Sequence, residues 1–310
     1  MTVLVTGATG FVGRALVERL ARDSRVAVRA VVRRTSVDLP GNVERVAGEL
    51  DAAWDWRPAL ADVTTVVHLA ARVHVMRDRT ADPLAEYRRV NVAGTEHLAR
   101  SAAMSGVRRF VFLSSVKVNG EAGTFRETDA PRPVDPYGVS KLEAEGAVRA
   151  VAAGTSMEVA IIRAPLVYGP NVGANFGSLI RAVQSGIPLP LGAVKNRRSL
   201  VALDNLVDFI TVCMQHPGAA GETFFVSDGE DVSTADLVRR LARAGGHSAR
   251  LIPVPPSLLA LAASLTGRGD VVQRLMGTLC VDITRARRQL AWVPPVSLDE
   301  GLRRAITAAR

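Results

Sequence analysis

Tyr137 and Lys141 lie in the sequence Tyr-Gly-Val-Ser-Lys, and a pair of serines ending at Ser115 precedes them in the chain. Residues spaced in this way on an α-helix share one face, so a phenol and an ammonium group would be neighbours. The positive charge of the lysine would lower the pKa of the phenol, which suits a tyrosine that gives or takes a proton. With Ser115 hydrogen-bonding the reacting oxygen, these three residues predict a catalytic site for proton transfer coupled to hydride transfer.

A glycine-rich turn near residue 10 predicts a dinucleotide site. It follows an apolar strand of residues 2–6 and opens a helix of residues 11–20. Such glycines permit a tight turn, let a pyrophosphate approach the backbone, and allow the helix to pack on the strand. The helix N-terminus adds free N–H groups and the positive end of a dipole. The residues expected to bind the cofactor here are Gly7, Thr9, Gly10, Phe11, Val12 and Gly13.

The end of the second predicted strand, residues 26–32, indicates which dinucleotide is bound. A carboxylate at this place would hold the ribose 2′-hydroxyl of NAD. The chain has Arg33 and Arg34 instead, and two guanidinium groups suit a 2′-phosphate. NADP is therefore predicted, with NAD as the alternative. The competing interpretation is that both are surface arginines of an arginine-rich protein.

Two further strand ends are expected against the cofactor. Glu49 and Leu50 follow the third predicted strand, residues 43–47, where an adenine edge would lie. The fourth, residues 64–69, ends in small side chains that let the backbone approach the cofactor. The residues expected there are Leu69, Ala70 and Ala71.

The elements that must position these residues alternate between strands and helices, which indicates parallel βαβ units. Residues 83–104 form a long helical stretch, and residues 109–113 and 159–162 are the fifth and sixth strands. Asp135 before Pro136 predicts the start of the helix that carries Tyr137. The fold class is therefore α/β, with a doubly wound parallel sheet of the Rossmann type.

After residue 170 the alternation breaks. Residues 1–170 are expected to form the dinucleotide-binding domain with the catalytic residues. Residues 171–310 are expected to form a smaller α/β region that caps the strand ends, with some segments returning to the sheet. Its predicted elements are helices at 205–214, 234–244 and 298–308 and a strand at 222–226.

The charge and amino-acid composition of the chain limit which ligands and which cellular compartment are expected. The net charge is +9, but aromatic residues are only 5% and no basic run carries interleaved aromatics, so nucleic acid is not an expected partner. A small polyanionic ligand explains the charge better. The two cysteines, Cys213 and Cys280, lie in apolar stretches, which predicts reduced thiols in a cytoplasmic protein.

Several other classes are disfavoured. The first residues are typical of a strand and not of a signal peptide. No apolar run reaches the roughly 18 residues of a membrane span, and residues 258–265 are expected to form a buried or interfacial helix. No cluster of histidine, cysteine and carboxylate side chains has metal-ligand spacing, so no metal is expected.

Motifs along nearly the whole chain resemble the extended short-chain dehydrogenase/reductases of the NAD-dependent epimerase/dehydratase family. They are the glycine turn, His-Leu-Ala-Ala at 68–71, Asn-Val-Ala-Gly-Thr at 91–95, Ser114–Ser115, the Tyr137 motif and Val-Tyr-Gly-Pro at 167–170. The resemblance implies catalytic roles for Ser115, Tyr137 and Lys141, and a cofactor contact by Asn91. It also implies a UDP-sugar substrate and a homodimer.

The resemblance further implies residues that meet the substrate. Asn175 and Arg198 match positions that contact the diphosphate, and Arg274 would be a second clamp. Lys117 is also expected to contact the substrate. Nucleotide-sugar dehydratases carry an acidic pair where this chain has Val116 and Lys117, so dehydration is disfavoured.

Several functions remain open at this point, among them a reductase of non-nucleotide carbonyls, against which Asn175 and Arg198 count. The main prediction is reduction of the C4 keto group of a UDP-4-keto-6-deoxy-N-acetylhexosamine, with Tyr137 as proton donor. The resemblance implies this substrate, and Arg33 and Arg34 suit an enzyme that consumes NADPH. The alternative is a UDP-glucose or UDP-N-acetylglucosamine 4-epimerase that retains NAD. A non-catalytic dinucleotide sensor is disfavoured, since it would not need Ser115, Tyr137 and Lys141 together.

Overall fold

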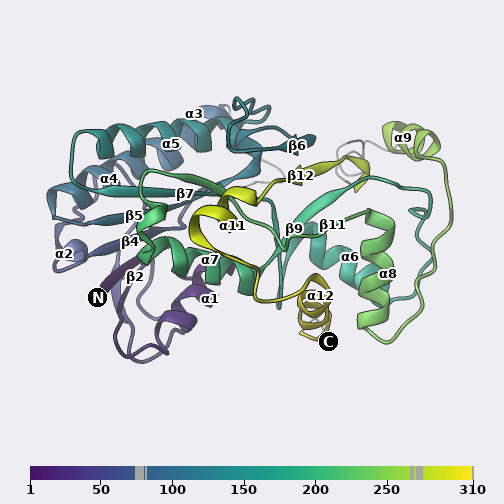
Figure 1. Cartoon of the computed structure of the whole chain (residues 1–310), viewed down its shortest axis with the longest axis horizontal. Coiled ribbons are helices and arrows are strands. Elements are labelled where there is room, and N and C mark those ends of the chain that lie inside the picture. Colours follow the sequence, from purple (N-terminus) through teal and green to yellow (C-terminus); the bar gives the residue numbers. More distant parts are fainter. Residues whose placement is uncertain (74–79, 81, 266–268, 270–274, 309–310) are drawn as a thin grey trace.

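The computed structural model describes residues 1–73, 80, 82–265, 269 and 275–308. Within these residues, seven parallel strands form one sheet in the order β10-β7-β5-β4-β1-β2-β3 (Figure 1). This is the predicted Rossmann-type, doubly wound α/β fold. The strands are β1 (Thr2–Thr6), β2 (Ala27–Val32), β3 (Glu44–Ala47), β4 (Thr65–His68), β5 (Arg109–Ser115), β7 (Glu158–Ala164) and β10 (Thr223–Phe225).

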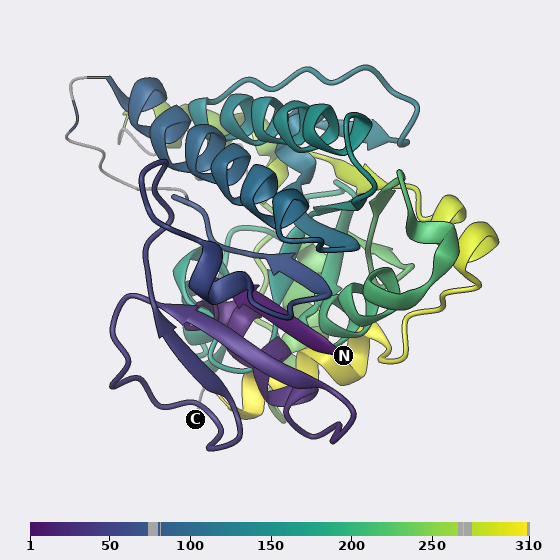
Figure 2. The same cartoon turned by 90° about the vertical axis from the view of Figure 1, so that its left-hand side faces the viewer.

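Helices cover both faces of this sheet, as Figures 1 and 2 show. Helices α1 (Phe11–Leu20) and α7 (Leu203–Gln215) pack on one face. Helices α2 (Arg57–Leu60), α4 (Thr95–Met104) and α5 (Pro136–Ala153) pack on the other. Each face has its own apolar core, because every strand of a doubly wound sheet is buried on both sides.

The long helical stretch predicted at 83–104 is confirmed, with one feature that periodicity does not predict. Helix α3 (Pro83–Tyr87) runs into a π-helical turn, η1 (Arg88–Gly94), and then into α4. Asp82 caps α3 by accepting a hydrogen bond from the backbone N–H of Ala85 (3.0 Å). The π turn widens the helix where it passes the carboxyl ends of the parallel strands.

A second, mixed sheet lies beside the first, and α6 (Ala174–Gln184), α8 (Thr234–Ala244) and α12 (Leu298–Thr307) surround its core (Figure 1). One of its strands comes from the first half of the chain, whereas β10 belongs to the large sheet. The chain therefore crosses between the two sheets in both directions. The strands of the second sheet are β6 (Gly123–Phe125), β8 (Leu166–Tyr168), β9 (Arg198–Ala202), β11 (Asp231–Val232) and β12 (Leu279–Val281), and α11 (Thr284–Leu290) follows them.

Residues 258–265 form most of helix α9 (Pro256–Leu265). Of the two expectations for this helix, buried or interfacial, full burial is excluded, because Leu258 and Leu261 are 55% and 58% exposed. An apolar run reports hydropathy and not which neighbours cover it, and in α9 Leu259 packs against the core of the second sheet. Among the described residues, none of the helices combines the length and apolar character that crossing a bilayer requires. Cys213 and Cys280 are buried free thiols, as expected.

Candidate active site

The fold brings Ser115, Tyr137 and Lys141 to the carboxyl edge of the large sheet. Ser115 is the last residue of β5, and Tyr137 lies in the first turn of α5. The predicted start of α5 is confirmed, since Asp135 accepts a hydrogen bond from the Gly138 N–H (2.6 Å). This hydrogen bond caps α5 and fixes its first turn. The cap therefore also fixes the backbone of Tyr137, which lies in that turn.

The electrostatics around Tyr137 oppose its ionisation in the absence of ligand. Burial raises the pKa of the Tyr137 phenol well above its ordinary value, and Asp135 and Tyr87 raise it further. A side-chain hydrogen bond with Ser115 lowers this pKa. The Ser115 hydroxyl therefore lies close enough to the phenol to affect its ionisation, and a substrate oxygen placed beside both groups could hydrogen-bond to each.

Lys141 lies one turn after Tyr137 and is only 2% exposed. Its Nζ atom is 3.9 Å from the centroid of the Phe112 ring. Burial lowers the pKa of the Lys141 ammonium to about 7, although Glu145 acts in the opposite direction. This lysine is thus poised between its charged and neutral forms near neutral pH.

A buried ionic network holds α5 in place behind these residues. Glu145, fully buried, accepts hydrogen bonds from Arg163 of β7 (2.6 and 2.9 Å) and from the Ser114 hydroxyl of β5 (2.6 Å). Arg163 also donates to Asn119 (3.0 Å). Because charge-assisted bonds of this kind are directional, they fix α5 and its tyrosine relative to two strands. Sequence reasoning missed this network, since buried charged pairs have no local pattern.

The glycine turn has the shape that a dinucleotide requires. Gly7 has φ +70°, and a Cβ atom there would lie 2.7 Å from the Ala70 nitrogen. A Cβ atom on Gly13 would lie 2.0 Å from the Gly7 carbonyl oxygen. Gly10, the residue before α1, provides no side-chain cap, so no capping side chain bonds the N–H groups of the first turn. This cradle fits a pyrophosphate at the helix N-terminus.

The other predicted cofactor residues lie along the same edge. Parallel register places the ends of β1, β2, β4 and β5 together. Arg33 and Arg34 are exposed after β2. Neither guanidinium forms a hydrogen bond or ion pair within the part of the chain that the structure describes. Glu49 is exposed after β3, and Leu50 packs against Gly94 of the π turn.

The Asn91 side chain makes its hydrogen bonds within the protein in this structure. Its Oδ1 atom accepts a hydrogen bond from the Arg72 N–H (2.7 Å), and its Nδ2 atom donates to the Arg72 carbonyl (3.0 Å) and to the Ser140 hydroxyl (3.0 Å). Both amide hydrogens are thereby used. Asn91 joins the segment after β4 to α5, so its support for a cofactor would come through the backbone that it positions.

The residues expected to contact substrate lie on different elements. Asn175 is exposed in the first turn of α6. Arg198, at the start of β9, donates to the Gly277 carbonyl (3.0 Å), and burial lowers its pKa. Lys117 follows Ser115 closely and forms ion pairs with two carboxylates. Arg274 lies outside the described residues.

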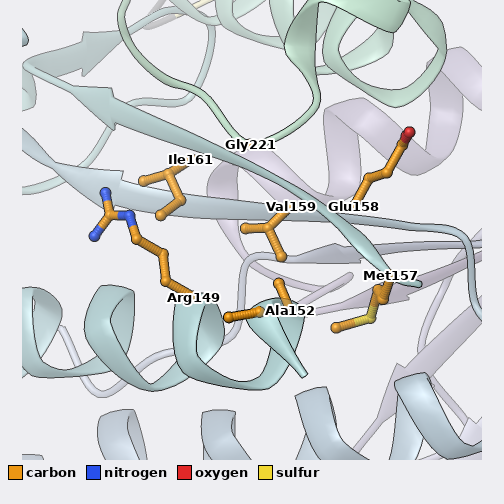
Figure 3. A pocket seen from close by; sticks show the side chains of 8 residues that line it. Arg149, Ala152, Met157, Glu158, Val159, Ile161 and Gly221 are labelled. Carbon is orange, nitrogen blue, oxygen red and sulfur yellow. The ribbon is translucent and has the colours of Figure 1, made fainter. Parts of the chain in front are cut away.

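A surface hollow elsewhere on the large sheet is distinct from this site. Figure 3 shows the hollow between the C-terminal part of α5 and strand β7, with Glu158 and Val159 among its lining residues. These begin β7, whereas Ser115 pairs with Ala164 at the other end of that strand. Its charged side chains are already ion-paired, Glu158 with Arg109 at 2.7 Å. No group of metal-ligating side chains occurs among the residues described.

Comparisons with known proteins find relatives over nearly the whole chain. A sequence model of the NAD dependent epimerase/dehydratase family matches residues 3–227. The chain is 48% identical to a UDP-glucose 4-epimerase of Vibrio cholerae, over 99% of this chain and 95% of that protein. The solved structure of MoeE5 with UDP-glucuronic acid and NAD has a TM-score of 0.79 at 31% identity, covering 100% of this chain and 99% of the other. A UDP-glucuronic acid 4-epimerase of Bacillus cereus, solved with NAD, shares the fold with a TM-score of 0.80 at 23% identity, covering 100% of this chain and 98% of the other.

Proposed function

The chain belongs to the NAD dependent epimerase/dehydratase family, and from that premise we propose that it is a UDP-sugar 4-epimerase. The observation that carries this proposal is the placement of Ser115 at the end of β5, Tyr137 in the first turn of α5 and Lys141 one turn later, at the edge of a glycine-turn dinucleotide cradle. The 48% identity to a UDP-glucose 4-epimerase, over nearly the whole chain, supports the epimerase over the predicted reductase.

In the proposed reaction, the C4–H and O4–H bonds of the sugar break and a C4 keto group forms. The nicotinamide, when bound, accepts the hydride and later returns it. Tyr137 takes the O4 proton as the hydride leaves. It returns the proton after the keto-sugar has rotated in the site to present its opposite face. Ser115 holds O4 beside the phenol by a hydrogen bond. The charge of protonated Lys141 stabilises the phenolate form of Tyr137.

The same residues explain how the chain would hold its cofactor. The uncapped N-terminus of α1 and the bare backbone at Gly7, Gly10 and Gly13 would bind the pyrophosphate. The small residues Ala70 and Ala71 leave room for the cofactor at the end of β4.

A second candidate function is supported by Arg33 and Arg34. Two exposed guanidinium groups without carboxylate partners among the described residues suit the 2′-phosphate of NADP. An epimerase returns its hydride and needs only a retained NAD, whereas a reductase consumes NADPH. Reduction of the C4 keto group of a UDP-4-keto-6-deoxy-N-acetylhexosamine is therefore the runner-up.

Further parts of the proposal rest on the resemblance and the fold. Residues 1–170 would carry the dinucleotide and the catalytic residues, and residues 171–310 would mainly hold the nucleotide sugar. Asn175, Arg198 and Arg274 would meet its diphosphate. A homodimer in the cytoplasm is proposed as the working form, and two buried free thiols are compatible with a reducing compartment.

Incubation with UDP-glucose and with UDP-N-acetylglucosamine tests the two functions. Proton NMR would show a C4 epimer, with no net change in cofactor, if the chain is an epimerase. Stoichiometric oxidation of NADPH by a UDP-4-keto sugar, with no epimer from either substrate, would establish the reductase and overturn the epimerase proposal.

A further inference from the structure

Lys117 joins the turn after Ser115 to the start of the helix that carries Tyr137. Its Nζ atom forms an ion pair with Asp135 and a second with Glu121 (2.9 Å). The Lys117 and Asp135 side chains are only 24% and 19% exposed. Asp135 uses its other carboxylate oxygen to cap α5 through Gly138. The ion pair therefore acts on the residue that fixes the first turn of α5.

Backbone contacts tie the same two segments together. The Lys117 N–H donates to the Ser115 hydroxyl oxygen (3.3 Å). A Cβ atom on Gly138 would lie 2.7 Å from the Lys117 carbonyl oxygen, so the turn and the helix are in close contact there. The turn that carries Lys117 therefore contacts both Ser115 and the first turn of α5, which carries Tyr137.

The charged and titratable groups around Tyr137 come from several elements. Asp135 precedes α5, and Lys141 lies on it. From α3, the Tyr87 ring lies 6.1 Å from the Tyr137 ring, centroid to centroid, and the Arg72 guanidinium lies 5.5 Å from the Tyr87 ring centroid. Lys117 and Glu121 approach from the turn after β5. Asp135 opposes a phenolate on Tyr137, and the ammonium paired with Asp135 offsets that charge.

We propose that Lys117 is a positioning residue that neutralises Asp135 and holds the first turn of α5 against Ser115, so that Tyr137 can ionise. Lys117 stands where a substrate contact was expected, but its ammonium group is directed to the helix cap instead. The inference deepens the proposed function and rests on it, since it assumes that Tyr137 moves the proton.

A tyrosinate titration tests the inference without any sugar substrate. The chain has three tyrosines, so subtracting the ultraviolet titration of Tyr137→Phe isolates Tyr137 in protein that holds its dinucleotide. Lys117→Met should raise the Tyr137 midpoint by about one pH unit, because a nearby negative charge is left unpaired. Lys117→Arg should keep the midpoint of the unmodified protein.

The double variant Lys117→Met with Asp135→Asn is the decisive comparison. Asparagine keeps a capping oxygen but carries no charge, so the midpoint should return toward that of the unmodified protein. Lys195→Met, which removes the charge of an exposed lysine elsewhere, is the matched control and should not move it. An unchanged midpoint in Lys117→Met, or no restoration by Asp135→Asn, would overturn the inference.

The pH profile of turnover is the second readout. In Lys117→Met the acid limb of kcat should move to higher pH by a similar amount, with KM little changed. A raised KM with an unmoved limb would mean that Lys117 contacts the substrate, which contradicts the inference. If the unmodified protein converts no UDP-sugar, the proposed function fails, whereas the tyrosinate titration still decides the role of Lys117.

Discussion

The Nζ atom of Lys141 lies 3.9 Å from the centroid of the Phe112 ring, in a site where the lysine side chain is almost wholly buried. The aromatic face offers a partner for the cation, but burial still lowers the pKa of Lys141 from 10.5 to about 7. A buried amine that loses its proton this easily lowers the free energy of unfolding at low pH. The active site therefore retains a residue that opposes stability.

Replacing Lys141 by methionine should stabilise the ligand-free protein while abolishing turnover. The unfolded chain binds the lysine proton up to about pH 10.5, whereas the folded chain releases it near pH 7. The stability of the unmodified protein should therefore rise with pH across that window. At pH 6 the variant should be more stable by roughly 2–4 kcal/mol, and the difference should shrink by pH 10.

Urea midpoints measured from pH 6 to pH 10 for both proteins would check this prediction. The difference between the two curves isolates Lys141 from other titrating groups. A Lys141→Met variant that is less stable than the unmodified protein at pH 6 would contradict the account of this site.

Tyr137→Phe should lower turnover by about 10²–10⁴-fold, the usual contribution of a general acid or base. The hydroxyl is removed without a change in ring packing, so the dinucleotide should bind with nearly unchanged affinity. Steady-state rates and calorimetric titration with the cofactor measure the two effects. Preserved turnover would exclude Tyr137 as the proton-transfer residue.

Gly13→Ala should disrupt the dinucleotide cradle. The new Cβ atom would meet the Gly7 carbonyl oxygen at 2.0 Å, so α1 must move away from the turn that would hold the pyrophosphate. We expect loss of cofactor binding and a destabilisation of about 2 kcal/mol or more, measured by calorimetry and urea unfolding.

Gly146→Ala is the matched control for that change. Gly146 lies on the exposed side of α5, and an added Cβ atom would meet nothing within 4 Å. This variant should be more stable by about 0.5–1 kcal/mol, because alanine favours a helix over glycine. Equal effects of the two substitutions would show that close packing at Gly13 is not the cause.

Arg33→Asp should weaken NADPH binding by about 10–100-fold, as expected for the loss of a charged hydrogen bond. Binding of NADH should change little, since it has no 2′-phosphate. Arg22→Asp makes the same charge change at another exposed arginine and should leave both affinities unaltered. Equal weakening of the two cofactors by Arg33→Asp would mean that Arg33 does not contact a 2′-phosphate.

The parts of the fold with strong local signals could be predicted from the sequence. The strands at β1, β2, β4 and β5 were expected within a few residues, because buried parallel strands are continuous apolar runs. The start of α5 was expected from Asp135 and Pro136. By contrast, β6, β8 and β12 of the second sheet have three residues each, too few to show a period.

The sequence predicted the catalytic residues of the candidate site, but not the ion pairs that support them. Tyr137 and Lys141 lie one turn apart on α5, and Ser115 ends the neighbouring strand β5, so the motif spacing predicted that the three side chains meet. The Glu145–Arg163 pair and the Lys117–Asp135 pair depend on which side chains meet after packing, which periodicity does not report. Asn91, a predicted cofactor contact, lies in the π turn and bonds the Arg72 backbone through its amide, a contact that the sequence pattern does not report.

The most direct test of the proposed epimerase is the fate of hydrogen at C4. UDP-glucose carrying deuterium at C4 would be incubated with the purified protein and its bound dinucleotide, and the product examined by NMR and mass spectrometry. The account predicts a C4 epimer that keeps its deuterium, with no net cofactor consumed and no product from Tyr137→Phe. Absence of the epimer, or an epimer that has lost the label to water, would contradict hydride removal and return within this site.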